Sequence, residues 1–519
     1  MTDGIFSERR GIAAFLLGCA GVTAGVILHL PMFIASAPMH YRLAGMPMDA
    51  GMLFGMAAII GGVIVASYGL LPVKLNAGSP SAAASITVAA PEDAALGPAH
   101  WRLMVVLVVA LTIDVMKPAT LGFTMTGMEG EYGVSAAHAA LVPFSAIAGT
   151  VTGSVVWGAI ADLYGRKASI LLSAVMFVGT SICGAMPSLE WNIFMCFLMG
   201  LAAGGMLPVT YALLAETMPV RHRGWALVLV GGLGAVAGYV AASGASALLQ
   251  PIFGWRILWL LNLPTGLLLV ALGALFPESP AYLIARGRRR EAQRIMQAFG
   301  AHAEVKRATP AAPSHQQAMP KSMTGKLIAL SLTALAWGLI NFGLILWLPA
   351  DLVARGYSVE IASALLAKSA LIALPMVFVA AFLYSRWSTK RTLVAMIVLT
   401  MVGLAGILWL AWIGGSPVLP VALLILGING VIATLLPYTA ESFPLRVRGR
   451  ATGWVAACSK GGGLVAQLLG VLALEPELAD AALLMLAPLA VALVLVIRFG
   501  RETRGRDLRS LDLSTAASP

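Results

Sequence analysis

The sequence is poor in charge: only 11% of its 519 residues are Asp, Glu, Lys or Arg, against about 25% in a soluble domain. Polar linkers of the kind that separate soluble domains do not dominate it, which excludes an ordinary cytosolic enzyme. Apolar residues make up 59%, and the mean hydropathy is +0.88. Runs of about 20 apolar residues are typical of bilayer-spanning helices, whereas outer-membrane barrels use alternating segments of about 10. The sequence therefore predicts an all-α, polytopic membrane protein.

Cysteine is scarce too, and all four cysteines lie inside apolar runs: Cys19, Cys183, Cys196 and Cys458. This placement disfavours a disulfide framework and a thiolate zinc site. The sequence has no G-x-x-x-x-G-K-[ST] loop, which disfavours ATP-driven pumping, and no cleavable signal peptide is evident. We expect no enzymatic activity, no cofactor and no resident metal.

Fourteen apolar runs are long enough to cross a bilayer. They lie near 11–36, 47–72, 102–124, 138–161, 168–187, 190–215, 225–249, 255–276, 326–349, 361–384, 391–412, 418–440, 450–473 and 480–498. Their grouping predicts an all-α fold of two six-helix bundles preceded by two additional transmembrane helices. The expected parts are an extra module with its linker (1–100), a first bundle (101–276), an inter-bundle loop (277–325), a second bundle (326–498) and a tail (499–519).

The basic residues predict how the chain crosses the membrane. With the N-terminus inside, 28 of the 34 Lys and Arg residues fall on cytoplasmic segments, as the positive-inside rule requires. The six exceptions are Arg42, Arg256 and Arg355 on outer segments and Lys117, Lys368 and Lys460 within spans. The net charge of +11 therefore reflects cytoplasmic loops rather than a nucleic-acid partner, and both termini are expected to be cytoplasmic.

An internal repeat relates the two halves of the chain. Residues 215–224 read A-E-T-M-P-V-R-H-R-G, and residues 440–449, which lie 225 positions later, read A-E-S-F-P-L-R-V-R-G. Matching turns in two six-span halves predict parallel repeats related by an axis along the membrane normal. The two leading spans have no counterpart in the second half, so they are interpreted as an added module.

One loop resembles the motif G-x-x-x-D-[RK]-x-G-R-[RK] of the major facilitator superfamily. Here it reads Gly158-Ala-Ile-Ala-Asp162-Leu-Tyr-Gly165-Arg166-Lys167, and the leucine at the first basic position is its departure from the pattern. Glycines let helices and a tight turn approach closely, and a carboxylate at a helix end can hold neighbouring cations. The equivalent loop of the second half, 385–391, has lost the acid and the glycine. The resemblance covers roughly 102–510.

Further signatures are similar to those of sugar porters and related metabolite carriers. Besides the repeated turns, they are the segments 277–283, 287–292 and 502–506. Sugar porters usually carry glutamines in core spans 5 and 7, but 225–249 has none and 326–349 offers Asn341. The ending 346–358 looks more like that of proton-coupled aromatic-acid and metabolite symporters, or of organic-ion carriers related to synaptic-vesicle proteins. The resemblance implies secondary transport by alternating access.

Asp114 is the acid that lies well inside a span, where an ionisable residue costs about 2.5–3.5 kcal/mol and marks a functional site by default. It precedes Lys117 by three residues, hence on the same helical face, and Pro118 should weaken the helix there. We expect Asp114 to take the coupling proton while Lys117 holds it ionised. The alternative is an inert buried ion pair.

Lys460 lies about ten residues inside its span and is followed by three glycines, which leave room for a ligand. It is expected to bind the anionic group of a substrate, with snorkelling to the interface as the alternative. For Lys368, nearer a span end, snorkelling or packing is favoured. Three cations against one acid predict an anionic substrate, because unpaired buried charge is costly.

Polar and aromatic residues of core spans 4, 7 and 10 could line a transport cavity, although such residues also pack at helix contacts. The candidates are Tyr211, Trp337, Asn341, Trp347, Thr434 and Tyr438. An inner gate is predicted where charges gather at the cytoplasmic ends of the spans, with a plain solvated charge cluster as the alternative. Its members are Gly158, Asp162, Gly165, Arg166, Lys167, Glu216, Arg221, Arg223, Glu441, Arg446 and Arg448.

The sequence therefore predicts a transporter of the inner (plasma) membrane that imports a small organic anion, a carboxylate metabolite or an aromatic acid, together with protons. We expect it to act as a monomer in the lipid bilayer. A proton-driven multidrug or metabolite exporter is the alternative, and a non-transporting receptor is disfavoured by Asp114 and the repeated turns. A Cu(I) or soft-metal carrier would use the Met and His residues of the extra spans, which flexible apolar packing also explains: His29, Met32, Met39, His40, Met46, Met48, Met52 and Met56.

Overall fold

The computed structural model describes residues 9–71, 86–89, 95–300, 302–305, 321–443 and 445–504. Within these ranges, 13 helical stretches are long and apolar enough to cross a membrane. One further long helix, α22 (Leu445–Val471), carries several basic residues and stands where the sequence predicts another span. The structure thus confirms an all-α membrane protein and agrees with the expected number of spans.

The extra module packs as a helical hairpin. Its elements are α1 (Arg9–Ile27), α2 (Leu30–Ala35), η1 (Ala37–Met39) and α3 (Ala50–Leu70). Asp49 caps α3, because its carboxylate accepts a 2.7 Å hydrogen bond from the Met52 backbone N–H. Glycines at facing positions, such as Gly21 and Gly62, let α1 and α3 approach closely. Met32 and Met52 are buried in the core that this pair shares with the first bundle.

The first bundle follows the extra module. It consists of α5 (Pro98–Tyr132), α6 (Ala136–Ala139), α7 (Leu141–Tyr164), α8 (Arg166–Gly179), η2 (Thr180–Ala185), α9 (Leu189–Ala203), α10 (Met206–Thr217), α11 (Val220–Phe253), α12 (Ile257–Leu260), α13 (Asn262–Leu272) and η3 (Gly273–Leu275). The second bundle consists of α16 (Lys321–Leu339), the π-helical turn η4 (Ile340–Leu344), α17 (Ile345–Ala354), α18 (Val359–Ala373), α19 (Met376–Arg386), α20 (Thr389–Ile413), α21 (Val418–Ser442), α22 and α23 (Leu478–Phe499).

Short elements cover one end of the molecule. Two helices, α14 (Pro280–Ala285) and α15 (Arg289–Ala298), follow the first bundle. A two-stranded antiparallel ribbon joins β1 (Ile86–Ala89) to β2 (His302–Val305), with Ile86 opposite Val305. The ribbon thus links the segment before α5 to the segment after α15, a pairing that the sequence analysis did not predict.

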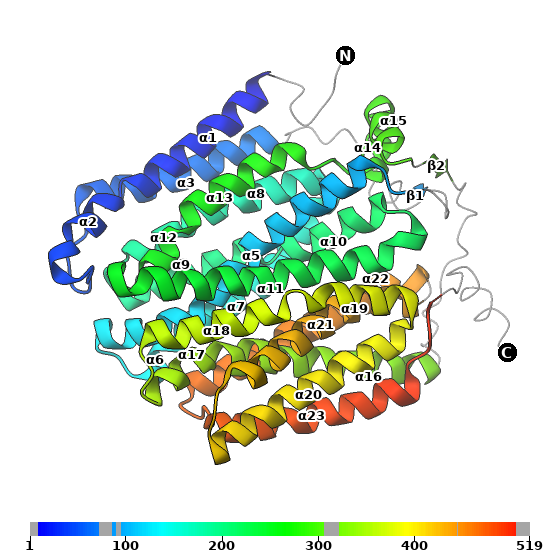
Figure 1. The fold of residues 1–519 in the computed structure, drawn as a ribbon. Helices are drawn as coiled ribbons and strands as arrows, with labels where there is room; N and C mark the ends of the chain where they lie inside the picture. Colours follow the sequence, from blue (N-terminus) through cyan, green and yellow to red (C-terminus); the bar gives the residue numbers. More distant parts are fainter. Residues whose placement is uncertain are drawn as a thin grey trace.

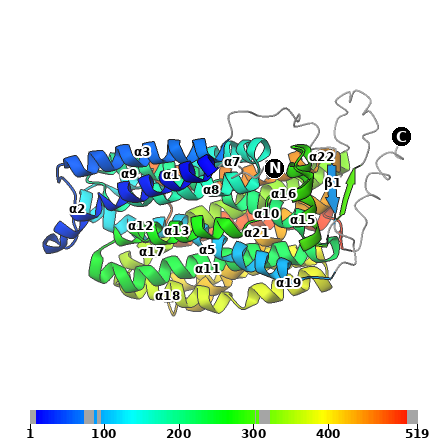
Figure 2. The same cartoon turned by 90° about the horizontal axis from the view of Figure 1, so that it is seen from above.

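The three helical parts lie beside one another. Figure 1 shows the hairpin of α1 and α3 at the top, the first bundle below it and α16, α20 and α23 of the second bundle at the bottom. In the view from above, α1 and α3 lie along the edge opposite α18 and α19 (Figure 2). The start of α1 and the end of α23 both lie at the end of the molecule that carries α15 and the ribbon (Figure 1).

Candidate functional site

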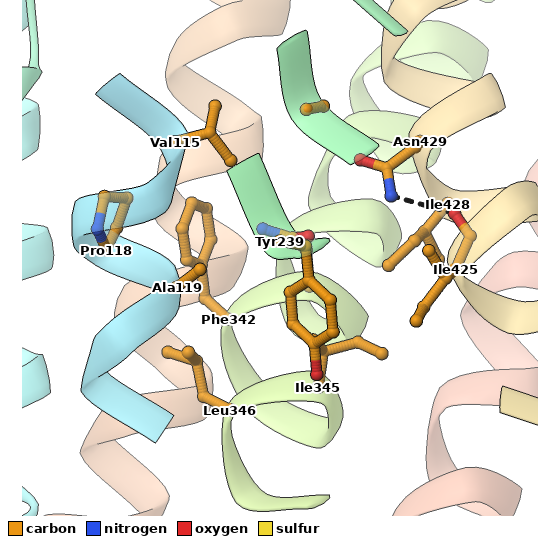
Figure 3. Close-up of a pocket in the computed structure, with 12 residues that line it drawn as sticks. Val115, Pro118, Ala119, Tyr239, Phe342, Ile345, Leu346, Ile425, Ile428 and Asn429 are labelled. Atoms are coloured by element: carbon orange, nitrogen blue, oxygen red, sulfur yellow. Dashed lines mark hydrogen bonds between the residues drawn. The ribbon is translucent and has the colours of Figure 1, made fainter. Parts of the chain in front are cut away.

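A small cavity of about 50 Å³ lies between the two bundles. It is lined by residues of α5, α11, η4, α17 and α21: Val115, Pro118, Ala119, Ala235, Tyr239, Asn341, Phe342, Ile345, Leu346, Ile425, Ile428 and Asn429. Figure 3 shows the rings of Tyr239 and Phe342 on its wall and Asn429 bonded to the backbone of its own helix. Most of the wall is apolar, and a few polar groups point into it.

Two interruptions of helical geometry adjoin this cavity. Pro118 has no N–H to bond the carbonyl of Asp114, four residues earlier in α5. The π-turn η4 carries Asn341 and Phe342, and the carbonyl of Phe342 accepts from the Gln467 side-chain amide of α22 instead. Such turns occur frequently at functional sites. Backbone groups are thus freed beside the cavity on both bundles.

Asp114 and Lys460 come from opposite bundles. Asp114 is only 6% exposed and makes no hydrogen bond or ion pair within the described ranges. Its charged neighbours are Lys460 of α22 and Lys117, and Asp114 is in turn the acidic neighbour of Lys460. Asp114 directly precedes Val115, which lines the cavity.

Lys117 is turned into the first bundle. Its ammonium is fully buried, donates to the Phe177 carbonyl at 2.9 Å and to the Thr180 hydroxyl, and lies 3.6 Å from the centre of the Phe177 ring. These partners belong to α8 and η2, so the ammonium is held by neutral groups rather than paired with Asp114. Lys368, by contrast, is exposed on α18.

The predicted cavity residues separate into two groups. Asn341 lines the cavity, but the polar groups of Trp337, Tyr438 and Thr434 bond to backbone carbonyls of Ile428, Arg501 and Gly430. Trp347 and Tyr211 are half-buried, and Tyr211 packs against Gly231 of α11. Sequence reasoning missed Tyr239 and Asn429. Tyr239 is the single tyrosine of α11 and Asn429 the single asparagine of α21. A lone polar side chain in an apolar span was the sequence signal that could have identified them.

The Tyr239 hydroxyl is a polar group without a partner beside the cavity. The side chain is 6% exposed, and its hydroxyl has no hydrogen-bond partner in the described part of the chain. An unpaired buried hydroxyl costs about 1–3 kcal/mol, so a bound molecule that bonds to it would gain that much. Tyr239 is therefore the clearest polar contact that the cavity offers to a ligand.

At the end that carries α15, the first-bundle part of the predicted gate forms one connected cluster. Arg166 contacts Glu216 at 2.5 Å, and the Ser279 hydroxyl donates to the other oxygen of Glu216 at 2.5 Å. Glu278 is 3% exposed and accepts from the backbone N–H of Arg166 at 2.8 Å, so it caps α8. Gly165 has a φ of +100°, and a β-carbon there would collide with the Glu278 carboxylate.

The second bundle repeats this arrangement with different residues. Glu502 accepts from the Thr389 backbone N–H at 3.0 Å and hydroxyl at 2.6 Å, which caps α20 as Glu278 caps α8. Thr503 donates to Glu441 at 2.8 Å, in the role of Ser279 toward Glu216. Hydroxyl groups of Thr389 and Thr503 thus hold the second cluster together.

The two capping carboxylates have opposite pKa shifts, and both lie outside the spans. Burial raises the pKa of Glu278 to about 7, although backbone N–H groups oppose the shift. Around Glu502, burial is outweighed by hydrogen bonds from Ser388 and Thr389, which bring its pKa down to about 2. Glu278 can therefore take up a proton near neutral pH, and Glu502 stays ionised.

The other predicted gate residues are placed in different ways, and the backbone N–H of Lys167 donates to Glu278 of the first cluster at 3.5 Å. Asp162 is exposed and makes no ion pair with a described residue, and Arg221 is exposed as well. Lys167 donates to the Ala274 carbonyl at 3.4 Å, Arg223 is half-buried, and Gly158 faces open space. The side chains of Arg446 and Arg448 lie outside the described residues.

Contacts join the bundles on both sides of the cavity. At one end of α11, the Ser246 hydroxyl lies 2.7 Å from that of Ser363 on α18, and both residues are buried. At the other end, Gly224 lies so near Tyr384 and Glu441 that an added β-carbon would stand 3.0 Å and 3.3 Å from them. The cavity is therefore bounded by inter-bundle contacts toward both ends.

Two six-helix bundles around a central cavity, with a buried acid, Asp114, directly before the cavity residue Val115, are typical of a secondary transporter of the membrane. The chain belongs to the Major Facilitator Superfamily, whose family model matches residues 103–467. It is therefore a multi-pass membrane transporter and not an enzyme.

Individual relatives agree with this class. A niacin transporter, NiaP, of Acinetobacter baylyi is 29% identical over 440 residues, which cover 81% of this chain and 98% of that protein. The 4-hydroxybenzoate transporter PcaK of Pseudomonas aeruginosa is 29% identical over 427 residues, covering 77% and 93%. An inward-open structure of the xylose transporter XylE from E. coli has a TM-score of 0.63 at 15% identity, covering 80% and 99%. The similarity to XylE supports the fold alone.

Proposed function

We propose that the chain imports a small aromatic carboxylate together with a proton, by alternating access. The observation that carries the proposal is the buried acid Asp114 of the first bundle, which directly precedes the cavity residue Val115 and has Lys460 of the second bundle as a charged neighbour. A carboxylate substrate and Asp114 compete for the same ammonium. Protonation of Asp114 leaves Lys460 without an anion, and a substrate carboxylate then takes its place.

This competition couples the two fluxes. Lys460 is half-buried within a span, where a charge without a counter-ion is costly. The bundles therefore rearrange readily in two cases: when Asp114 is ionised and the cavity is empty, or when Asp114 is protonated and the substrate is bound. Lys117 moves with Asp114, because its partners belong to the same bundle. It supplies a constant positive field that favours the ionised acid, whereas the field of Lys460 changes as the bundles rock.

The cavity wall fits a flat ring. Phe342, Ile345 and Ile428 offer apolar contact, and Asn341 and the unpaired Tyr239 hydroxyl can bond to a ring substituent or ring nitrogen. Two relatives are named as transporters of niacin and of 4-hydroxybenzoate, which are both aromatic carboxylates. These names support an aromatic carboxylate as the substrate class. Trp337, Thr434 and Tyr438 are proposed to support the cavity wall, and Tyr211 to line the path into it.

The gate and the orientation complete the proposal. The clusters around Glu216 and Glu441 close the cytoplasmic side, and they open as the bundles separate there. The excess of Lys and Arg supports a cytoplasmic position for this end and for both termini. With bacterial relatives, we infer an inner-membrane protein that works as a monomer.

Uptake into proteoliposomes under an imposed proton gradient tests the proposal. Nicotinate, 4-hydroxybenzoate and benzoate are offered separately, with xylose and Cu(I) as competing classes, and the gradient is applied in either direction to distinguish import from export. We expect accumulation of an aromatic acid that collapses with a protonophore. Accumulation of xylose or Cu(I) but of no aromatic acid would overturn the substrate class.

Two substitutions separate the roles of the charged pair. Asp114→Asn should abolish gradient-driven accumulation while counterflow exchange of the same acid continues, because a permanently neutral residue mimics the protonated state. Lys460→Gln should weaken binding of the acid by about tenfold or more, as loss of a buried charge-assisted hydrogen bond predicts. Accumulation by the Asp114→Asn variant at the native level contradicts the proton role. Unchanged binding by the Lys460→Gln variant contradicts the anion role.

A further inference from the structure

A second cavity lies away from the transport path, at the end of the molecule that carries α15. Its volume is about 260 Å³, and it lies between the start of α5, the segment 274–277 that ends the sixth span of the first bundle, and α15. Much of its wall is apolar, with Leu103, Phe276 and Phe299 among its residues. The amphipathic helix α15 closes one side, and its residues Ala292 and Met296 are buried.

Two guanidinium groups line this apolar cavity, and no acidic side chain among the described residues pairs with them. Arg102 of α5 and Arg294 of α15 are both exposed, and neither makes a hydrogen bond or ion pair with a described residue. Lys167 adds a third cation at the same place, because its ammonium donates to the carbonyl of Ala274 on the cavity wall. The acid carried by α15, Glu291, is already engaged by Arg288. The cavity therefore combines a positive charge with an apolar wall.

Large apolar side chains are exposed beside this cavity. Trp101, next to Arg102, is 50% exposed, and Leu275 is 48% exposed. Large apolar side chains exposed at the ends of spans face lipid, and tryptophan is typical of the boundary between lipid and water. The cavity thus opens where phospholipid headgroups lie, at the end that the basic residues assign to the cytoplasm.

We propose that this cavity binds the headgroup of an anionic phospholipid of the cytoplasmic leaflet. Arg102 and Arg294 bind the phosphate oxygens, and the first part of an acyl chain lies along Leu103 and Phe276. Basic pockets at the cytoplasmic ends of spans recognise anionic headgroups in this way. An apolar wall and a mouth toward lipid favour a phospholipid over a free anion, whose hydration such a wall would remove.

Lipid binding at this place would fasten α15 to the first bundle. The chain runs from the cavity wall at Pro277 directly into Glu278, which caps α8 beside the Arg166–Glu216 pair. A bound lipid therefore supports the first-bundle half of the cytoplasmic gate. The site is separate from the substrate cavity, so lipid binding is measurable without transport.

The experiment counts bound lipid on the full-length, delipidated protein in detergent by native mass spectrometry. Phosphatidylglycerol is titrated against phosphatidylcholine and against inorganic phosphate, for the native chain and for the double variant Arg102→Gln with Arg294→Gln. The matched control is Arg289→Gln with Arg290→Gln, which removes two exposed arginines of α15 that do not line the cavity. Ala298→Phe fills the cavity and keeps both arginines.

We expect one phosphatidylglycerol to bind the native chain and the control alike. The double variant should bind it at least about tenfold more weakly, on the scale of two lost basic contacts, and Ala298→Phe should weaken it as well. Equal binding by the double variant and the native chain would overturn the proposal, and so would unchanged binding by Ala298→Phe. Equal retention of phosphatidylcholine would rule out recognition of charge. Competition by inorganic phosphate at equal concentration would identify a free-anion site instead of a lipid site.

Discussion

Lys117, Lys368 and Lys460 show how differently three lysines can be placed within one helical membrane protein. Lys117 is held by a carbonyl, a hydroxyl and an aromatic face inside one bundle, whereas Lys460 has Asp114 of the other bundle as its acidic neighbour. Lys368 is exposed. Only for Lys460 does a movement of the bundles change the distance to an opposite charge. For a lysine inside a span, a charged partner on the other bundle is therefore more relevant to transport than a charged residue nearby in the sequence.

Glu278→Gln tests the buried carboxyl that caps α8. Burial raises the pKa of Glu278 to about 7, above the ~4.3 of an exposed glutamate. The folded protein thus keeps a proton that the unfolded chain releases between these two values. This stabilisation is complete at low pH and is lost as the pH rises through about 7. Relative to the variant, the native free energy of unfolding should fall by roughly 1–3 kcal/mol between about pH 5 and pH 8, as followed by unfolding in detergent.

The matched control for this prediction is Glu291→Gln, which removes a carboxylate paired with Arg288 on the surface. Such surface pairs contribute about 0–1 kcal/mol, so the control should leave the pH dependence almost unchanged. A difference between the native chain and Glu278→Gln that stays constant over the whole pH range contradicts the raised pKa.

At the scale of elements, the turn between α7 and α8 depends on a glycine. Gly165 has a φ of +100°, and its α-carbon faces the Glu278 carboxylate. Gly165→Ala should therefore destabilise the fold by roughly 1–3 kcal/mol through backbone strain and the displaced cap. Gly158→Ala, seven residues earlier, meets nothing within 4 Å and should be neutral or stabilise α7 by up to about 1 kcal/mol. Thermal unfolding of both variants checks the contrast, and equal effects would show that the turn tolerates a side chain.

Besides the apolar core that it shares with the first bundle, the extra module contacts a buried ion pair of that bundle. Glu131 at the end of α5 contacts Arg256 at 2.7 Å, with their side chains 5% and 0% exposed. The same carboxylate accepts from the backbone N–H groups of Leu43 and Ala44 at 2.7 Å and 3.0 Å. The loop between α2 and α3 is thereby tied to the first bundle, so the module moves with that bundle.

Glu131→Gln should consequently destabilise the protein by about 3–5 kcal/mol, because a buried Arg256 loses its counter-ion. Hydrogen exchange at Leu43 and Ala44 should accelerate in the same variant, since their acceptor weakens. Arg355→Gln removes an exposed pair with Asp351 and should cost at most about 0.5 kcal/mol. Unchanged exchange at Leu43 and Ala44 would argue against Glu131 as the anchor of the loop.

Much of the architecture could be predicted because periodicity and repeats are local signals. Apolar runs predict the spans, and the 225-residue repeat predicts two bundles. The sequence did not predict that Glu278 and Glu502 have the same role, because the residues around them differ. The role becomes visible in the structure, where Glu278 caps α8 and Glu502 caps α20. Trp337 and Tyr438 bond to distant carbonyls that no spacing discloses. The inward direction of Tyr239 likewise depends on how α11 is rotated in the bundle.

The whole molecule consists of one unit that contains the extra module and the first bundle, and a second unit facing it. Contacts between the units include one zone at each end of α11, where Ser246 meets Ser363 and Gly224 meets Tyr384. The central cavity lies between these two zones. Alternating access requires each zone to open while the other stays closed, so a bond across one zone should stop the cycle.

Ser246→Cys with Ser363→Cys tests this requirement. The two hydroxyls are 2.7 Å apart, which suits a disulfide between the corresponding sulfurs. In the oxidised double variant, gradient-driven uptake should fall at least about tenfold, and reductant should restore it. A disulfide across the Ser246–Ser363 zone would keep that side of the cavity closed, so substrate could not enter. Each single variant, treated with the same oxidant, should transport normally and so controls for the chain's own four cysteines. Full uptake by a fully cross-linked double variant would mean that α11 and α18 do not separate during transport, which contradicts a rocking motion of the two units.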